Sequence, residues 1–339
     1  ERSYDSLGRP VGIVLDADYA VGYGYDDLGR FASIAVSNGL RFEYSYVPDS
    51  DLLAGWHVAG GAAAAYAYEP NRNLRTEVVN MSDGNPISSF GYTCDAAGRR
   101  TQRVDGRANP PGEPLAVTNA FGYNVRSELD AAIMGTNQFG YQYDAIGNRQ
   151  VAIANDTTNL YQANGLNQYT SILPASANPA YDTDGNMISD GTHAYVWDAE
   201  NRLLEVRSNG TAVVRNAYDF MGRRIQKATA AATNRFIYDG WLLVQEQSAT
   251  GGNLTTNSYL WGLDLSGTLQ GAGGVGGLLA ILSPGSGPLL PVNDANGNVT
   301  RLVDNNGSDV AYYKYDPFGN LLSQSGPAAE QNPFRFSSK

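Results

Sequence analysis

The segment Tyr23-Gly-Tyr-Asp-Asp-Leu-Gly-Arg30 contains the pattern that decides the fold, Tyr-Asp-x-x-Gly-Arg. This pattern returns at intervals of about 21 residues, as in the spacings from Tyr4 to Tyr25 and from Tyr25 to Tyr46. A fixed period of this length is the signature of a repeat architecture. Close and looser copies begin at Tyr4, Tyr25, Tyr46, Tyr68, Tyr92, Tyr123, Tyr143, Tyr181, Trp197, Tyr218, Tyr238, Asn293 and Tyr315.

Each repeat is predicted to form a β-hairpin. Two aromatic residues two positions apart precede the turn, as at Tyr23 and Tyr25, so that both rings lie on one face of a strand. The Asp that follows accepts backbone N–H groups of the turn, and the Gly three residues later takes a positive φ. The predicted turn positions are Asp5, Gly8, Asp26, Gly29, Asp95, Gly98, Asp144, Gly147, Asp182, Gly185, Asp219, Gly222, Asp316 and Gly319.

The hairpins are expected to pair edge to edge, because an isolated hairpin is only marginally stable in water. Two strands per repeat give roughly thirty strands, and so wide a sheet must coil or close. The sequence therefore predicts an all-β fold, a large spiralling sheet in the form of a β-shell or a β-solenoid. The aromatic positions expected to form a ladder across the strands are Tyr25, Tyr46, Tyr68, Tyr92, Tyr123, Tyr143, Trp197, Tyr218, Tyr238 and Tyr315.

The composition narrows the classes of function. The 339 residues carry a net charge of −11, which argues against nucleic acid as the main partner. Cys94 is the single cysteine, so no internal disulfide holds the fold. The sequence has no apolar stretch long enough for a membrane helix and no signal peptide at its start. Both ends interrupt the repeat pattern, which indicates a fragment of a longer chain.

The candidate catalytic residues lack partners at useful spacings. His57 and His193 are the two histidines, and neither belongs to a catalytic set or a zinc motif. The run Gly267–Gly277 contains G-x-G-x-x-G, but no helix follows it, so close backbone packing is the simpler interpretation. We therefore expect no catalytic residue, no cofactor and no metal, while calcium binding by the acidic turns and glycan binding by the tyrosines stay open.

The repeats resemble the YD repeats of the Rhs family, which includes bacterial polymorphic toxins, the B and C components of insecticidal toxin complexes, and teneurins. The resemblance covers essentially the whole chain. It is most specific at Tyr259-Leu-Trp261-Gly-Leu-Asp264, Asn293-Asp-Ala-Asn-Gly-Asn298 and Tyr315-Asp-Pro-Phe-Gly-Asn320, which are similar to the approach to the Rhs-associated core. The phrase Phe334-Arg-Phe-Ser-Ser-Lys339 is similar to the opening of that core.

The resemblance implies a hollow β-shell that encloses a C-terminal toxic domain, in a secreted or surface-exposed bacterial protein. It divides the chain into a YD-repeat region at 1–258 and the last repeats, leading into the core, at 259–339. The family's self-cleavage residues would lie beyond Lys339. Asp316-Pro-Phe-Gly319 echoes the cleavage phrase but matches an ordinary repeat, so we assign it no catalysis.

Two functions follow from these observations. The first is a non-enzymatic wall segment that encloses or presents a C-terminal cargo domain, with that domain or further repeats as partners. The alternative is an extracellular interaction or filament-forming module that binds proteins or glycans, because exposed strand edges favour self-association.

Overall fold

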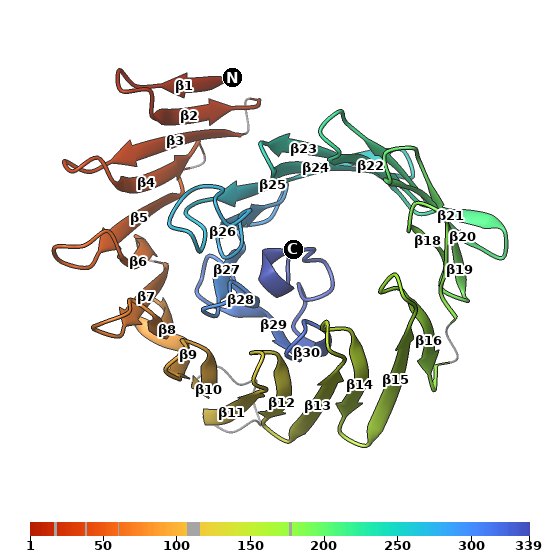
Figure 1. Cartoon of the computed structure of the whole chain (residues 1–339). Coiled ribbons are helices and arrows are strands. Elements are labelled where there is room, and N and C mark those ends of the chain that lie inside the picture. The colour runs from red at the N-terminus through yellow and green to blue at the C-terminus, as the bar shows by residue number, and fades with distance from the viewer. Residues whose placement is uncertain (17–18, 38, 60, 107–115, 176–177) are drawn as a thin grey trace. The chain divides into compact units, whose positions relative to one another are not determined.

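The computed structural model of the chain describes residues 1–16, 19–37, 39–59, 61–106, 116–175 and 178–339 (Figure 1). In these residues the secondary structure consists of thirty β-strands and one short 3-10 helix, η1 (Phe336–Ser338). No described helix has the length and apolar character needed to cross a membrane. The predicted all-β class, built of hairpins paired into large sheets, is confirmed.

The strands form three sheets in which the spatial order of the strands follows the order of the chain. The first sheet has sixteen strands: β1 (Arg2–Tyr4), β2 (Pro10–Val14), β3 (Ala20–Tyr25), β4 (Phe31–Val36), β5 (Arg41–Tyr46), β6 (Leu53–Val58), β7 (Ala62–Tyr68), β8 (Arg75–Ser82), β9 (Asn85–Cys94), β10 (Arg100–Gly106), β11 (Ala116–Tyr123), β12 (Leu129–Met134), β13 (Asn137–Tyr143), β14 (Arg149–Ala154), β15 (Thr157–Ala163) and β16 (Tyr169–Leu173). The second sheet has ten: β17 (Ala180–Tyr181), β18 (Met187–Ser189), β19 (His193–Trp197), β20 (Leu203–Ser208), β21 (Thr211–Tyr218), β22 (Arg224–Ala228), β23 (Thr233–Asp239), β24 (Leu242–Thr250), β25 (Asn253–Trp261) and β26 (Leu278–Leu282). The third has four: β27 (Leu290–Asn293), β28 (Val299–Val303), β29 (Asp309–Tyr315) and β30 (Leu321–Ser325).

The chain divides into two compact units. The first unit contains residues 1–118 and 258–339, so it joins the N-terminal strands β1–β10 to the end of the chain. The second unit contains residues 119–257, which include β12–β24. Strands β11 and β25 cross the two boundaries.

The turn of each repeat explains why these residues form hairpins. At Tyr25 the strand pairing shifts register, and the shift begins the turn. The N–H of Asp26 then donates to the carbonyl of Arg30, and the N–H of Gly29 donates to the carbonyl of Asp26, both at 2.9 Å. Gly29 has a φ of 82°, a value that side chains with a Cβ rarely adopt. The backbone hydrogen bonds that close this turn thus lie within residues 26–30.

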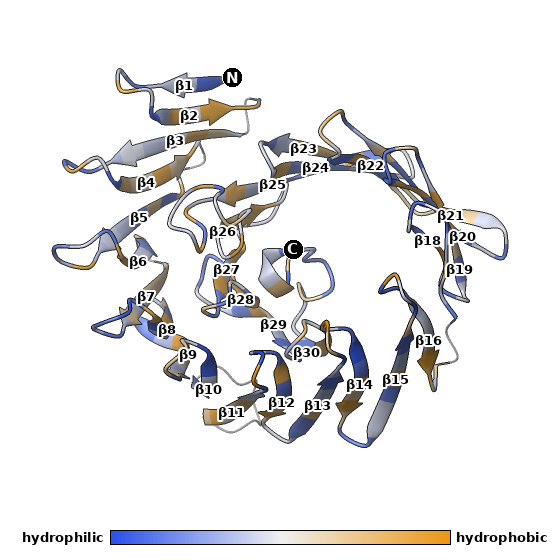
Figure 2. Cartoon of the chain, in the orientation of Figure 1, coloured by the Kyte–Doolittle hydropathy of each residue, from blue (hydrophilic) through white to orange (hydrophobic). Residues whose placement is uncertain are grey.

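The core of the first unit lies between the N-terminal strands and the C-terminal segment, which we define as residues 258–339. Tyr19, Ile34 and Phe42 of the N-terminal half are almost fully buried, and every residue of β28 is buried. Burying one such apolar side chain stabilises the folded state by about 1.5–3 kcal/mol. Figure 2 shows hydrophobic and hydrophilic stretches interspersed along the strands, as expected for sheets that have one face packed and one face wet.

The second unit has fewer buried side chains, and many residues of its strands are only half-buried. The strands at its N-terminal and C-terminal ends carry most of its buried apolar residues. These are Ala132, Met134, Phe139, Tyr141, Ala152, Leu242 and Val244.

Candidate functional site: tyrosine contacts to the C-terminal segment

In most repeats that have an Asp after the aromatic residue, the carboxylate closes its own turn. One carboxylate oxygen of Asp5 accepts the N–H groups of Leu7 and Arg9 at 2.9 Å, and the other accepts Nε of Arg9 at 2.7 Å. The backbone hydrogen bond from Arg9 comes first among the causes that hold the pKa of Asp5 below its usual value. Turns with the same carboxylate bonds, to Arg or Asn at the closing position, occur at Asp26, Asp95, Asp144, Asp182, Asp198, Asp219, Asp294 and Asp316.

The turn glycines that the sequence singled out take positive φ angles. They are Gly8, Gly29, Gly98, Gly147, Gly185, Gly222 and Gly319. Because the acidic side chains close the turns, their oxygens point back to their own backbone. No group of three or more His, Cys, Asp or Glu side chains within the described ranges could hold a metal ion.

At eight of the ladder positions the aromatic side chain is hydrogen-bonded to the repeat before it. The Tyr25 hydroxyl donates to the carbonyl of Pro10 at 2.8 Å, and the Tyr46 hydroxyl donates to that of Phe31 at 2.7 Å. Six later ladder positions make the corresponding bond to the preceding repeat: Tyr68, Tyr143, Tyr218, Tyr238, Tyr315 and, through its indole N–H, Trp197. The ladder therefore joins consecutive hairpins through side chain to backbone hydrogen bonds.

Arginines complete this contact between repeats. The guanidinium of Arg9 lies 4.2 Å from the centre of the Tyr25 ring, and that of Arg30 lies 4.2 Å from the Tyr46 ring. Such cation–π contacts contribute about 0.5–1 kcal/mol at exposed sites. Sequence reasoning missed both the stacking and the acceptor of the tyrosine hydroxyl. The signal was present, because in the better copies the Tyr follows the Arg of the preceding turn at a nearly constant interval.

Two tyrosines outside this series of bonds reach from the N-terminal strands to the C-terminal segment. The hydroxyl of Tyr19 donates to the carbonyl of Tyr259 at 2.8 Å. The hydroxyl of Tyr44 accepts the N–H of Leu263 at 3.2 Å. Burial raises the pKa of both phenols, so both stay neutral hydrogen-bonding groups at ordinary pH.

A third tyrosine, Tyr92, is a ladder position that serves this contact. Its hydroxyl accepts the N–H of Ala295 at 2.9 Å, and burial raises its pKa. Its ring, with Val78 and Phe90, packs against Ala295 in one buried cluster. A bond between groups so distant in sequence fixes the C-terminal segment against β9.

A buried ion cluster stands beside Tyr92. Arg103 donates to both carboxylate oxygens of Asp105, at 2.6 and 2.8 Å, and lies 3.4 Å from Asp294. The side chains of Arg103 and Asp294 are 14% and 2% exposed. Burial alone would lower the pKa of Arg103, but the two carboxylates hold it above its usual range. Breaking a buried pair by removing one partner costs about 3–5 kcal/mol, so this cluster also ties β10 to the C-terminal segment.

The glycine-rich run binds a carboxylate of its own chain. Asp264 accepts the N–H groups of Ser266, Ala272 and Gly274 at 2.9, 2.7 and 3.1 Å. Backbone N–H groups turned toward one point form an anion site. Here Asp264 fills it, so the run organises a loop.

The two histidines and the cysteine are not among the residues described above as contacting the C-terminal segment. His57 Nε2 is 3.5 Å from a carboxylate oxygen of Glu43, and His193 Nδ1 is 3.6 Å from one of Asp190. Cys94 is half-buried at the start of a turn. The two histidines belong to different units.

A family model described as Teneurin YD-shell matches residues 115–338. The chain belongs to this YD-shell family. Among curated proteins, the YD-shell chain is 29% identical over 220 residues to "tRNA3(Ser)-specific nuclease WapA" of Bacillus spizizenii. It is 28% identical over the same length to "tRNA nuclease WapA" of Bacillus subtilis. These matches cover 62% of this chain and 9% of each relative, so the chain spans about a tenth of their length.

Solved structures agree with the family assignment. The complex TcdB2-TccC3-Cdc42 matches 99% of this chain with a TM-score of 0.75 at 14% identity, and the match spans 21% of that chain. The Photorhabdus luminescens Tc holotoxin pore matches 96% of this chain with a TM-score of 0.70 at 15% identity, over 19% of that chain. The membership of the Rhs/YD-repeat family expected from the repeats is confirmed, and the fold is that of the shell in these toxin structures.

Proposed function

We propose that this chain is a non-enzymatic wall segment of a secreted or surface-exposed Rhs-type protein, and that it holds a C-terminal cargo domain. Its work is mechanical. The hairpins would form the wall, and the C-terminal segment is bound to the N-terminal part of the chain. The polypeptide that follows the segment would then be kept on the same side as the segment itself.

The contact of Tyr92 with Ala295 carries this proposal. A wall that only separates two volumes needs no bonds to its own C-terminal segment. Tyr19, Tyr44 and Tyr92 all make such bonds, although roughly 200 residues or more separate each from its partner. The Arg103 cluster adds charge pairing at the same place. Together they make a fixed attachment for whatever the C-terminal segment leads into.

The names of the relatives suggest the class of cargo. The curated relatives are tRNA nucleases by name, and the matched part is a small share of each. A nuclease domain is therefore the first cargo to look for. Because the net charge of this chain is −11, we expect RNA to bind the cargo domain and not the wall.

The test is electron microscopy of the purified native protein, with the intact mass measured on the same sample. Hollow closed particles, with a mass per chain well above 36.3 kDa, are expected. Limited proteolysis before and after mild denaturation then asks whether a C-terminal domain is protected. Filaments built from chains near 36.3 kDa would contradict the proposal and favour a filament-forming module.

A further inference from the structure

Residues 332–339, which we call the 332–339 peptide, pack within the first unit, where their helix η1 contacts β28 (Figure 1). Asn332 and Phe334, near the start of the peptide, are buried. The two residues before it, Glu330 and Gln331, are exposed. The 332–339 peptide is therefore linked to the preceding chain through exposed residues and has buried contacts of its own.

Phe334 occupies an aromatic site that β25 provides. The centre of its ring lies 4.7 Å from that of Tyr259 and 5.4 Å from that of Trp261, with interplanar angles of 76° and 82°. Both contacts are edge to face, at distances within the roughly 4.5–7 Å where aromatic pairs attract each other. All three side chains are buried. Phe334 is therefore an anchor of the kind that dominates the energy of many binding interfaces.

Phe336 occupies a second site, at the end of β29 and on the turn that follows it. Its ring centre lies 5.7 Å from that of Tyr315, at an interplanar angle of 67°. A Cβ at Gly319 would come within 2.6 Å of the Phe336 ring, so the glycine of this turn leaves the ring its space. The spacing of two between Phe334 and Phe336 thus places one ring on β25 and the other on β29.

Backbone hydrogen bonds hold the peptide between and beyond the two rings. The N–H of Val299, in β28, donates to the carbonyl of Arg335 at 2.9 Å. The N–H of Ser337 donates to Oδ1 of the Asn298 side chain at 2.8 Å. Because main-chain bonds of this kind do not depend on side-chain identity, they fix the register of the peptide on β28 and leave specificity to the two rings.

Ser338 joins the peptide to two further loops of the first unit. Its hydroxyl accepts the N–H of Gly276 at 3.1 Å and donates to the carbonyl of Gly297 at 2.7 Å, and the side chain is almost fully buried. Ser337 and Ser338 have φ angles of 53° and 52°, which residues with a Cβ rarely adopt. Backbone of this kind persists where its surroundings fix it, as these hydrogen bonds do here.

We infer that the first unit contains a peptide-binding site, which in this chain is occupied by its own residues 332–339. The site fits a peptide with two aromatic side chains two positions apart and a hydroxyl two positions after the second. It holds that peptide when the backbone before it is cut, so a polypeptide joined to the peptide stays attached without a covalent bond. The use of such an attachment rests on the proposed function, whereas the binding itself does not.

The test uses the full 339-residue chain with a site for a sequence-specific protease inserted between the exposed residues Glu330 and Gln331. After cleavage, gel filtration and mass spectrometry ask whether the 331–339 fragment elutes with the rest of the chain. We expect it to do so, and we expect an excess of isotopically labelled 331–339 peptide to replace it. A fragment that separates during gel filtration, or one that the labelled peptide cannot replace, would overturn the inference.

Substitutions in the labelled peptide leave the folded protein unchanged. A peptide with Phe334→Ala should need a concentration at least about tenfold higher for the same replacement, because losing a buried aromatic anchor weakens binding by about that factor or more. A peptide with Gln331→Ala is the control, since Gln331 is exposed. Equal replacement by the Phe334→Ala peptide would also overturn the inference.

The outcome is independent of the test of the proposed function. Hollow particles whose fragment separates after cleavage would leave the proposed function standing and remove the peptide site. Filaments whose fragment is retained and replaced would do the reverse.

Discussion

Gly262 lies so close to Tyr44 that a Cβ at position 262 would overlap the tyrosine hydroxyl oxygen and the side chain of Leu279. The neighbouring N–H, that of Leu263, donates to the same hydroxyl. The absence of a side chain at position 262 is therefore what allows β5 and the C-terminal segment to meet at hydrogen-bonding distance.

Gly262→Ala is expected to lower the free energy of unfolding by about 1–3 kcal/mol, the usual cost of overpacking a well-filled site. Urea denaturation checks this. The matched control is Gly91→Ala in β9, where a Cβ would meet nothing within 4 Å and φ is not positive. Equal urea midpoints for the two variants would show that the Tyr44 side chain can move aside. The packing of Tyr44 against position 262 would then not be tight.

Tyr46→Phe should lower the free energy of unfolding by about 1 kcal/mol. The substitution removes the hydroxyl that donates to Phe31 and keeps the ring that stacks under Arg30. Tyr4→Phe is the control, because Tyr4 holds the same repeat position but is 56% exposed. The comparison uses urea midpoints, and a loss as large for Tyr4→Phe would argue against the bond between repeats.

Gly222→Val should destabilise the second unit by about 1–2 kcal/mol, because φ is 78° and left-handed backbone is costly for a residue with a Cβ. Gly165→Val is the control. Both glycines have open space around the added Cβ, but Gly165 does not have a positive φ. Thermal unfolding followed by circular dichroism separates backbone strain from crowding. If Gly222→Val is no less stable than the control variant, the turn at Gly222 can change to another turn type.

Acid should destabilise the chain through its turn carboxylates. The side-chain bond from Arg99 is the first of the causes that hold the pKa of Asp95 below its ordinary 3.8. Because the folded value is lower than the unfolded one, the carboxylate stabilises the fold above about pH 4, and this stabilisation is lost as the pH falls through the folded value. Urea midpoints should stay level above about pH 5 and fall below about pH 4.

Asp95→Asn tests the contribution of one turn to this acid dependence. The variant should start less stable near pH 7, and its midpoint should change less on acidification than that of the unmodified chain. An identical acid dependence in both proteins would assign the effect to other carboxylates.

Much of the fold could be predicted because its decisive interactions are local. The Asp26 turn closes within five residues, so the Tyr-Asp-x-x-Gly-Arg phrase alone identifies a hairpin. Repetition of that phrase then predicts hairpins paired edge to edge into a large sheet, and the structure has three sheets, of sixteen, ten and four strands. The family assignment followed from the same phrase. The positions of Gly8 and Gly29 could be named in advance because a positive φ favours glycine wherever it occurs.

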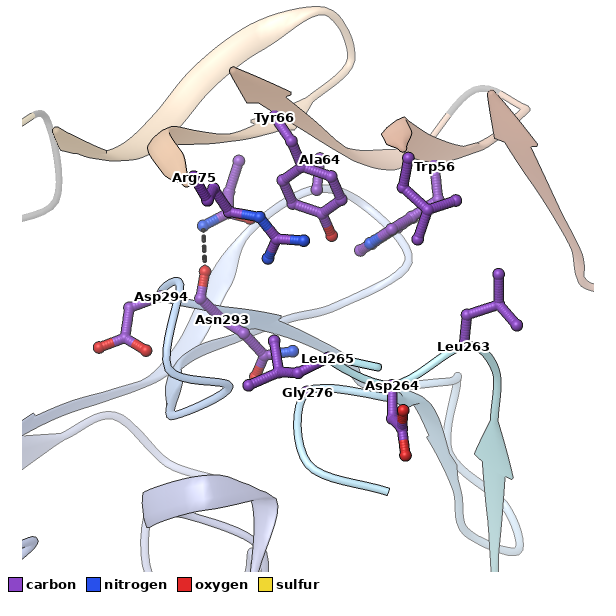
Figure 3. Close-up of a pocket in the computed structure, with 12 residues that line it drawn as sticks. Trp56, Ala64, Tyr66, Arg75, Leu263, Asp264, Leu265, Gly276, Asn293 and Asp294 are labelled. Atoms are coloured by element: carbon purple, nitrogen blue, oxygen red, sulfur yellow. Dashed lines mark hydrogen bonds between the residues drawn. The ribbon is translucent and has the colours of Figure 1, made fainter. Parts of the chain in front are cut away.

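The contacts to the C-terminal segment could not be predicted in this way. Tyr44 and Tyr46 are the two aromatic residues before one turn, and only Tyr46 was named as a ladder position. Yet the Tyr44 hydroxyl bonds to Leu263 and the Tyr46 hydroxyl to Phe31. The partner of Tyr46 follows the repeat, but that of Tyr44 depends on the element that packs against β5. The small pocket lined by Asn293 is likewise invisible in the sequence, because Tyr66 of β7 and Arg75 of β8 line it too (Figure 3).

By itself, then, the sequence determined the repeat, the turn and the all-β class, since backbone angles and hydrogen bonds within a few residues specify them. The tertiary structure decided which of the many tyrosines bond to segments that are distant in the sequence. The physical reason is that Tyr92 and Ala295 meet only after many hairpins have paired, and their bond depends on the summed geometry of all of them.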